Sequence, residues 1–335
     1  MGVKASYVTT GNDLQFFGKQ AEGSTSVFLP RNSNKFTYHE NINAAYLNYQ
    51  TKINKFSFQL GLRGEWTLAE GISASYTGAK DSTFKRDYFQ LFPSAFIQYE
   101  ANKDNTFGIT YSRRIDRPDY DRLNPFLFFL DPYTYQVGNP FLRPQLTNSM
   151  ELTHSFKGIV STTLSYSHTK DVMADILKQD DQARATYQTS DNLASQDNLG
   201  MNVSVNVPIT KWWMSTNDVN VSYTKISGMV QQASIVPEMT NFYFNLNNTF
   251  TLPRSYKLEV GGWYTSGGLW SIFRVSSQGG INLGLQKTLL EKKATLKLSV
   301  QDLLYTNKAT AIAQYGTVDI KASNTWDSRR VLLTF

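Results

Sequence analysis

The chain has 335 residues, of which 41% are hydrophobic and 14% aromatic, and its formal net charge is +6 at pH 7. Cysteine is absent, which excludes disulfides, thiolate metal ligands and cysteine nucleophiles. The Lys and Arg residues are scattered, so no basic run indicates nucleic-acid binding. No apolar run approaches the ~18 residues of a membrane-spanning helix, and the first residues lack the apolar core of a signal peptide.

Apolar and polar residues alternate with a period of two through almost the whole chain. In FSFQLGLRGEW (56–66), Phe, Leu and Trp share one face, while Ser, Gln, Arg and Glu share the other. The same alternation occurs in residues 88–99, 201–207, 281–286 and 295–301. This pattern indicates half-buried strands, and no segment has a convincing helical period. We therefore expect an all-β fold.

Two kinds of connection separate the expected strands. Short polar turns lie near residues 54–55, 103–105, 157–158, 210–211, 253–254 and 291–293. Longer irregular stretches are expected at residues 20–35, 68–86, 117–145, 174–195, 227–238, 266–276 and 308–323. Together they connect about 14 antiparallel strands, with short turns at one end and long loops at the other. This layout is typical of a transmembrane β-barrel.

A soluble β-sandwich would also alternate, but three features favour a membrane barrel. The expected strands run for ten or more residues, and one face is rich in Asn, Gln, Ser, Arg and Glu, as a water-filled lumen permits. Aromatic residues also lie near strand ends, where the interface girdles of a barrel belong. These residues are Tyr49, Trp66, Tyr99, Trp213, Tyr223, Tyr256 and Tyr264.

The three histidines, His39, His154 and His168, have no metal-ligand spacing and accompany no nucleophile motif. We therefore expect neither an enzyme nor a metal or cofactor site.

The segment LNPFLFFLDPYTYQVGNP (123–140) is the most apolar and aromatic in the chain, yet half of the 10 prolines lie in or beside it. Proline excludes a central strand or a helix interior. An exposed patch this apolar would promote association, so we expect the segment to fold back against the barrel's mouth or inner wall. Phe126, Phe128, Phe129 and Tyr133 are the expected anchors.

Charged residues precede this segment, because four arginines interleave with aspartates in SRRIDRPDYDR (112–122). They could bind an anionic or sugar-like ligand through guanidinium groups and stacked Tyr rings. The favoured interpretation is a salt-bridge network that holds the loop, because alternating Arg and Asp can satisfy each other. The candidates for ligand binding or loop anchoring are Arg113, Arg114, Arg117, Asp119, Tyr120, Arg122, Phe126, Phe128, Phe129, Tyr133 and Tyr135.

Residues 111–152, YSRRIDRPDYDRLNPFLFFLDPYTYQVGNPFLRPQLTNSMEL, resemble the central signature of a Bacteroidota-type outer-membrane β-barrel family. That family is similar to the C-terminal barrel part of TonB-dependent receptors. In this stretch the sequence GNPFLRP precedes a strand that carries Glu151, as in the wider receptor pattern. Gln145 departs from the pattern, which usually has Glu there.

The resemblance implies a bacterial outer-membrane receptor that takes up a bulky, scarce solute through a barrel of about 22 strands. Such receptors carry an N-terminal plug that couples to a TonB-type energy-coupling protein. Neither a plug nor a signal peptide is recognisable in residues 1–335, so we expect one partial barrel domain from the C-terminal part of a larger barrel. The alternative is a self-contained 14-stranded passive outer-membrane channel.

The end of the chain, WDSRRVLLTF, places Val331, Leu333 and Phe335 on one face of a last strand. This pattern resembles the C-terminal signal read by the barrel-assembly machinery, with Phe335 as the terminal aromatic residue. The expected partners are that machinery, outer-membrane lipid, the TonB-type protein through the missing plug and a surface lipoprotein, with no nucleic acid.

Overall fold

The computed structural model describes residues 1–19, 25–78, 81–131, 133–180, 184–230, 233–316 and 318–335. Strands make up most of these residues, which confirms the all-β prediction. The described strands form a sheet of 17 strands, and 14 of them remain as its main ladder when the short branches β8, β9 and β14 are left out.

The 14 strands of the main ladder pair antiparallel in chain order. They are β1 (Gly2–Leu14), β4 (Asn34–Ile53), β5 (Phe56–Ser75), β6 (Ser82–Asn102), β7 (Asn105–Asp116), β10 (Gln145–Phe156), β11 (Val160–Asp180), β12 (Ala185–Thr210), β13 (Trp213–Val230), β15 (Glu238–Leu252), β16 (Tyr256–Thr265), β19 (Gln278–Leu289), β20 (Ala294–Gln301) and β23 (Arg330–Thr334).

Smaller elements lie in the connections of this ladder. They are β2 (Phe17–Gly18), β3 (Val27–Phe28), η1 (Pro30–Asn32), α1 (Tyr120–Leu123), β8 (Leu127–Asp131), β9 (Thr134–Val137), β14 (Ala233–Ile235), β17 (Gly268–Trp270), β18 (Phe273–Val275), η2 (Leu290–Lys292), β21 (Lys308–Tyr315) and β22 (Val318–Thr325). Among the described residues, no helix is long and apolar enough to cross a membrane.

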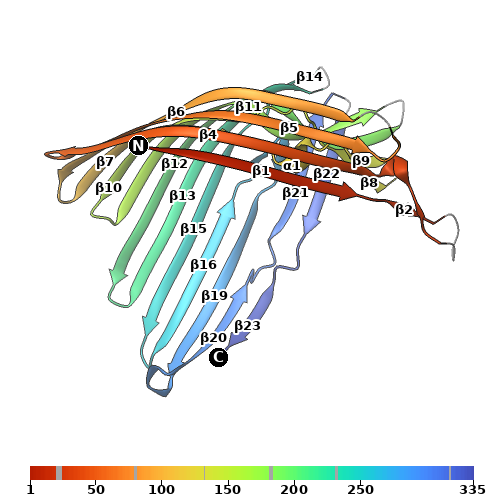
Figure 1. Cartoon of the computed structure of the whole chain (residues 1–335). Helices are drawn as coiled ribbons and strands as arrows, with labels where there is room; N and C mark the ends of the chain where they lie inside the picture. The colour runs from red at the N-terminus through yellow and green to blue at the C-terminus, as the bar shows by residue number, and fades with distance from the viewer. Residues whose placement is uncertain (20–24, 79–80, 132, 181–183, 231–232, 317) are drawn as a thin grey trace.

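The sheet is a curved, open wall (Figure 1). Within the described part of the chain, β1 pairs only with β4 and β23 pairs only with β20, so the two end strands do not close the sheet. The predicted number of strands and their antiparallel order are therefore confirmed, and the wall has two edges.

The ends of the strands show the expected asymmetry. Short connections follow β4, β6, β10, β12, β15 and β19 at one end, and the last of them contains η2. The connections that carry the other smaller elements lie at the opposite end (Figure 1). The extent of two long loops was predicted wrongly, because strand pairing continues through most of residues 68–86 and 174–195. The stretches 266–276 and 308–323 likewise contain the strand pairs β17–β18 and β21–β22 rather than irregular chain.

The outward face of the wall is apolar along its middle. One register row crosses eight strands, and from Ile97 to Phe242 its side chains are 36–50% exposed. The row consists of Phe58, Ile97, Ile109, Leu152, Leu164, Met201, Val221 and Phe242. A continuous apolar band on the outside of a sheet is the surface that contacts lipid in a membrane barrel.

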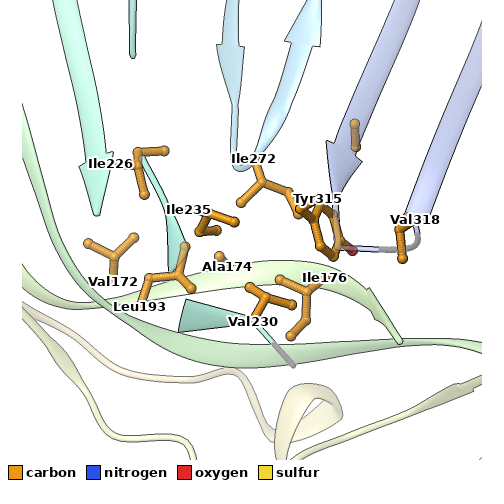
Figure 2. Close-up of a cluster of buried hydrophobic side chains, with 11 residues drawn as sticks. Val172, Ala174, Ile176, Leu193, Ile226, Val230, Ile235, Ile272, Tyr315 and Val318 are labelled. Atoms are coloured by element: carbon orange, nitrogen blue, oxygen red, sulfur yellow. The ribbon is translucent and has the colours of Figure 1, made fainter. Parts of the chain in front are cut away.

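Buried apolar residues gather instead at the end of the sheet that carries the long connections. Ile176 and Leu193 of β11 and β12 pack there with Ile226, Ile272 and Tyr315, the last two from the β17–β18 and β21–β22 connections (Figure 2). The Tyr315 hydroxyl donates to the carbonyl oxygen of Leu177 at 2.6 Å and accepts from its N–H at 3.0 Å. These connections therefore form a cap that is fixed to the wall.

Candidate functional site

The segment between β7 and β10 folds back onto the sheet, as expected from its prolines and aromatic residues. It contains α1, β8 and β9, and β9 pairs in parallel with the start of β12, with Tyr135 opposite Tyr187. Tyr135 and Tyr187 also stack at 5.1 Å between ring centroids. We call residues 117–144 the docked loop.

Two leucines bury the docked loop against the wall. Leu123 is 1% exposed and Leu142 is 0% exposed, and both pack on Phe36 of β4, which is 1% exposed. Phe128, Phe129 and Tyr133, which were expected to anchor the loop, are 48%, 40% and 66% exposed. These rings bury less surface than expected, because the side chains that enter the wall lie at the two ends of the segment.

Arg117 fastens the beginning of the docked loop. Its Nη2 donates to Glu65 Oε2 at 2.6 Å and to the Thr67 hydroxyl at 3.1 Å, while its Nε donates to the Tyr88 hydroxyl at 3.2 Å. Arg63 Nε reaches the other carboxylate oxygen of Glu65 at 2.5 Å. Burial opposes the charge of Arg117, but Glu65 and Tyr88 outweigh it and raise the pKa of the guanidinium.

Arg122 makes a second fastening on the wall. Its Nη2 lies 3.4 Å from Asp175 Oδ2 of β11, and the Ser190 hydroxyl of β12 donates to Asp175 Oδ1 at 2.7 Å. Asn139 Nδ2 donates to the carbonyl oxygen of Ser190 at 3.1 Å. The predicted salt-bridge network thus exists, but the expectation that neighbouring Arg and Asp residues satisfy each other is wrong for Arg117 and Arg122, whose acidic partners come from distant strands.

Gly138 lets two parts of the docked loop meet. Its N–H donates to the Asn124 carbonyl oxygen at 2.9 Å, and the N–H of Asn139 donates to the Arg122 carbonyl oxygen at 2.6 Å. A Cβ at position 138 would collide with the carbonyl oxygens of Asn124 and Arg122. The sequence GNP in this segment therefore has a steric reason, since only glycine allows the two backbones to approach.

The contacts of Gln145, at the start of β10, explain why this position has glutamine where the receptor pattern usually has glutamate. Its Nε2 donates to Asp116 Oδ2 at 3.1 Å, and its Oε1 accepts from the N–H of Met173 at 3.0 Å. A glutamate could accept from Met173 but would place a second negative charge beside Asp116. Glutamine therefore suits this pair of neighbours.

A cavity of about 430 Å³ lies between the docked loop and the ends of β1, β11 and β12. Its lining combines charged, amide and aromatic groups, including Asn12, Asp121, Arg122, Phe126, Phe128 and Gln136. Gln136 Nε2 donates to Gln188 Oε1 at 2.9 Å across the β9–β12 pair. Phe126 stacks on Phe16 at 6.1 Å between centroids. Amide and guanidinium donors beside aromatic faces can bind an oxygen-rich, partly apolar solute.

The other candidates lie around this cavity or outside it. Arg113 Nη2 donates to Gln90 Oε1 at 3.1 Å, and Arg114 and Asp119 are exposed. The charge of Asp121 and a hydrogen bond to it raise the pKa of Tyr120. Of the 11 candidates, Arg122, Phe126 and Phe128 line the cavity directly.

Sequence reasoning did not identify Glu65 and Asp175 as site residues, although they hold the two loop arginines. A signal exists for Glu65, which lies on the polar face of FSFQLGLRGEW beside Arg63. A carboxylate on the inward face of a long strand needs a cationic partner, and the arginine-rich loop can supply that cation. Asp175 gives no comparable signal, because it lies in a stretch that was expected to be irregular.

The histidines have ordinary polar or aromatic neighbours. His39 Nδ1 bonds with the Thr9 hydroxyl at 3.0 Å, His154 stacks on Phe107 at 4.5 Å between ring centroids, and His168 Nδ1 lies 2.8 Å from Asp197 Oδ1. Within the described residues, no group of three or more His, Asp or Glu side chains could hold a metal ion.

An antiparallel wall with an apolar outer band, short turns at one end and long connections at the other defines a transmembrane β-barrel protein. The chain matches the model of the outer membrane protein beta-barrel family over residues 1–335, and the protein belongs to this family. It is therefore a protein of the bacterial outer membrane.

Solved structures of uptake receptors have the same fold at low sequence identity. The ferric-catecholate import receptor Fiu from K12 E. coli is 14% identical, with a TM-score of 0.64 over 99% of this chain and 50% of that chain. The siderophore receptor PiuA from Acinetobacter baumannii is 13% identical, with a TM-score of 0.61 over 89% of this chain and 43% of that chain.

The ferric yersiniabactin uptake receptor FyuA from Yersinia pestis is 12% identical, with a TM-score of 0.61 over 90% of this chain and 47% of that chain. The chain thus spans about half the length of these receptors. No curated protein sequence matches it.

Proposed function

We propose that this chain is the C-terminal part of the barrel of a TonB-dependent receptor that takes up a bulky, scarce solute. The observation that carries the proposal is the docked loop, which is fixed to the wall by Arg117 and Arg122 and leaves a polar and aromatic cavity beside Phe128 and Gln136. Ferric chelates, which the names of the structural relatives indicate for those proteins, are the first class of solute to test.

The open edges support a partial barrel. Among the described residues, β1 and β23 each pair with a neighbouring strand of the main ladder along one edge, and their other edges are unpaired in that ladder. Unpaired backbone edges are not tolerated in the hydrocarbon of a bilayer. The missing strands would pair with these edges, and a barrel of about 22 strands leaves room for a plug. Residues 1–335 are thus one partial barrel domain in this proposal.

The proposed partners follow from this arrangement. A TonB-type protein would couple through the plug, and outer-membrane lipid would cover the apolar band. The barrel-assembly machinery would recognise the last strand, where Val331, Leu333 and Phe335 are 68%, 70% and 83% exposed. A surface lipoprotein would contact the end with the long connections.

Cross-linking tests the partial barrel against the self-contained channel, and the absence of native cysteine makes engineered pairs unambiguous. In a closed 14-stranded channel β1 would pair with β23, so Leu333→Cys is combined in turn with Val3→Cys, Ala5→Cys, Tyr7→Cys or Thr9→Cys to test that contact in any register. We expect no cross-link between these positions in the full-length protein in outer membranes, whereas Ala5→Cys with Asn43→Cys should cross-link, because they are register partners in β1 and β4. A cross-link between any of these β1 positions and position 333 would contradict the proposal.

Solute uptake tests the cavity. Cells that depend on this receptor for iron should grow on one or more ferric chelates, and Phe128→Ala and Gln136→Ala should reduce uptake while leaving the amount of folded receptor unchanged. Phe129→Ala is the matched control, because Phe129 lies in the same strand outside the cavity lining. Equal uptake by all variants would contradict a role for this cavity.

A further inference from the structure

Three polar side chains lie on the outward face of the wall between β13 and β15. From the outward pair Val221–Phe242 towards the short turns, the register pairs on this face are Val219–Phe244, Asn217–Leu246, Ser215–Asn248 and Trp213–Phe250. Residues two apart along a strand lie on the same face of a sheet. Ser215, Asn217 and Asn248 therefore share the face of the apolar band, and we call them the polar triad.

The polar triad lies at the depth of the membrane hydrocarbon. Trp213 and Phe250 follow it near the ends of their strands, with 5.6 Å between their ring centroids, as members of the aromatic girdle beside the short turns. Towards the long connections, the Tyr223 hydroxyl donates to Glu238 Oε2 at 2.7 Å and marks the opposite girdle. The triad thus lies between the two girdles, in the half of the band that is nearer the short turns.

Hydrogen bonds join the polar triad but leave two of its groups unused. Asn248 Oδ1 accepts from the Ser215 hydroxyl and from Trp213 Nε1, both at 2.9 Å, and the Ser215 oxygen accepts from Asn217 Nδ2 at 3.0 Å. Among the described residues, no hydrogen bond uses Asn248 Nδ2 or Asn217 Oδ1. The triad therefore presents an amide donor and an amide acceptor to the hydrocarbon, which can satisfy neither.

A glycine on the next strand leaves room beside the polar triad. Gly262 of β16 is the register partner of Leu246, which in turn pairs with Asn217, so all three lie in one outward row. A Cβ at position 262 would meet only atoms at 3.7 Å or more, so packing within the chain does not require glycine there. Small residues on a lipid-facing surface let another transmembrane segment approach closely.

We propose that the outward face of β13–β16 binds the same face of a second copy of this chain, as a twofold dimer within the membrane. In this dimer Asn248 Nδ2 of one protomer donates to Asn217 Oδ1 of its partner, and symmetry repeats the bond in the other direction. A free donor beside a free acceptor makes the surface complementary to itself.

Two observations favour a second copy over lipid as the occupant. The ester oxygens of a phospholipid can accept from Asn248 but cannot donate to Asn217, so lipid would leave half of the polar surface unsatisfied. Strands β13 and β15 also lie well inside the ladder, several strands from the unpaired edges of β1 and β23. Strands added at those edges would not cover this face.

Energy transfer between labelled copies tests the dimer, and the absence of native cysteine allows a single labelling position. The full-length protein in phospholipid liposomes carries a donor or an acceptor dye at Lys211→Cys, in the turn before β13, or at Lys103→Cys, in the turn between β6 and β7. We expect transfer at low protein-to-lipid ratio, and more from position 211 than from position 103. No transfer, or equal transfer from both positions, would overturn the proposal.

Variants of the two asparagines test the reciprocal bonds. Asn217→Leu and Asn248→Leu should each raise the dissociation constant of the dimer about tenfold, because each removes both bonds between the protomers. An equal mixture of the two variants should associate better than either alone, since the mixed dimer keeps one bond. Asn220→Leu, which changes an inward residue of β13, is the matched control and should associate as the native protein does.

Heat-dependent gel mobility reports whether each variant is folded, and Asn217→Ala replaces Asn217→Leu if the leucine variant fails to fold. Native association by both folded leucine variants would overturn the proposal. So would a mixture that associates no better than its two components, because the bonds between the protomers would then not be reciprocal.

Discussion

Arg117 Nη2 lies 2.6 Å from Glu65 Oε2, and this contact joins the first residue of the docked loop to the inner face of β5, 52 positions earlier in the chain. The Glu65 side chain is 10% exposed and that of Arg117 is 21% exposed, so little water separates the two charges. The Arg117–Glu65 ion pair therefore holds the docked loop on the wall. It does not join residues within the loop to one another.

Replacing Arg117 should release the docked loop from the wall. Arg117→Gln removes the charge and leaves Glu65 nearly buried with Arg63 as its remaining cationic partner. We expect a loss of about 2–3 kcal/mol in the free energy that holds the loop closed, because a nearly buried carboxylate loses a charged donor. Hydrogen exchange of residues 117–144 measures this loss as faster exchange.

Arg114→Gln is the matched control for Arg117→Gln, because Arg114 is an exposed arginine three positions earlier. It should leave exchange in the loop unchanged. The double variant Arg117→Gln with Glu65→Gln should recover part of the protection, since the buried charge has been removed. Exchange that is unchanged in Arg117→Gln alone would show that the leucine contacts hold the loop without this ion pair.

Gly138→Ala should open the other end of the docked loop. The added methyl group would collide with the Asn124 carbonyl oxygen, which already accepts the N–H of residue 138. We expect a cost of about 1–3 kcal/mol, as for an overpacked site that must shift its backbone, and faster tryptic cleavage at Arg122. Gly11→Ala, where a Cβ meets nothing within 4 Å, should not change the cleavage rate. Equal cleavage of the two variants would contradict the steric role of Gly138.

The sequence predicted the wall better than the loops for a physical reason. Within the apolar band, lipid on one side and a polar interior on the other impose a strict alternation, as in residues 56–66, and polar turns mark each short connection. Above the band no lipid selects one face, so the polar stretch 174–195 does not look like strand although it forms a long pair. The extent of such strands depends on partners that composition does not reveal.

The partners of the loop arginines were beyond sequence reasoning for a similar reason. Asp119 lies two residues after Arg117 and Asp121 directly precedes Arg122, but the acids that pair with these arginines are Glu65 and Asp175. The choice depends on the direction in which the docked loop returns to the wall, and long-range contacts such as that of Leu123 with Phe36 determine that direction. The prolines and aromatic residues of the loop predicted that it folds back, but they did not predict which strands it contacts.

Gln145→Glu should make the start of β10 sensitive to pH. The new carboxylate would lie beside Asp116, whose Oδ2 is 3.1 Å from the present Nε2. A neighbouring like charge raises the pKa of a carboxylate, so the repulsion exists above that raised pKa and disappears as the pH falls through it. We expect a destabilisation of about 1 kcal/mol at pH 8, smaller at pH 4, in urea titrations of the folded protein.

Two variants check the origin of this effect. Asp116→Asn combined with Gln145→Glu should restore the stability at pH 8, because the amide donates where the carboxylate repelled. Gln145→Ala should lose the hydrogen bonds without gaining any pH dependence. A pH-independent loss in Gln145→Glu would assign the effect to the lost donor rather than to charge.

Tyr315→Phe should loosen the cap at the end with the long connections. The Tyr315 hydroxyl satisfies both backbone groups of Leu177, and the ring lies in the apolar cluster with Ile176 and Ile272 (Figure 2). Phenylalanine keeps the ring in that cluster but leaves the N–H and the carbonyl oxygen of Leu177 without this partner, at a cost of about 1–3 kcal/mol. Faster hydrogen exchange at residues 172–180 and 308–315 measures the effect.

Tyr264→Phe, which removes the hydroxyl of a 38% exposed ring, is the matched control and should exchange as the native protein does. Because β21 reaches β11 through this hydroxyl, unchanged exchange in Tyr315→Phe would mean that apolar packing alone holds the cap on the wall.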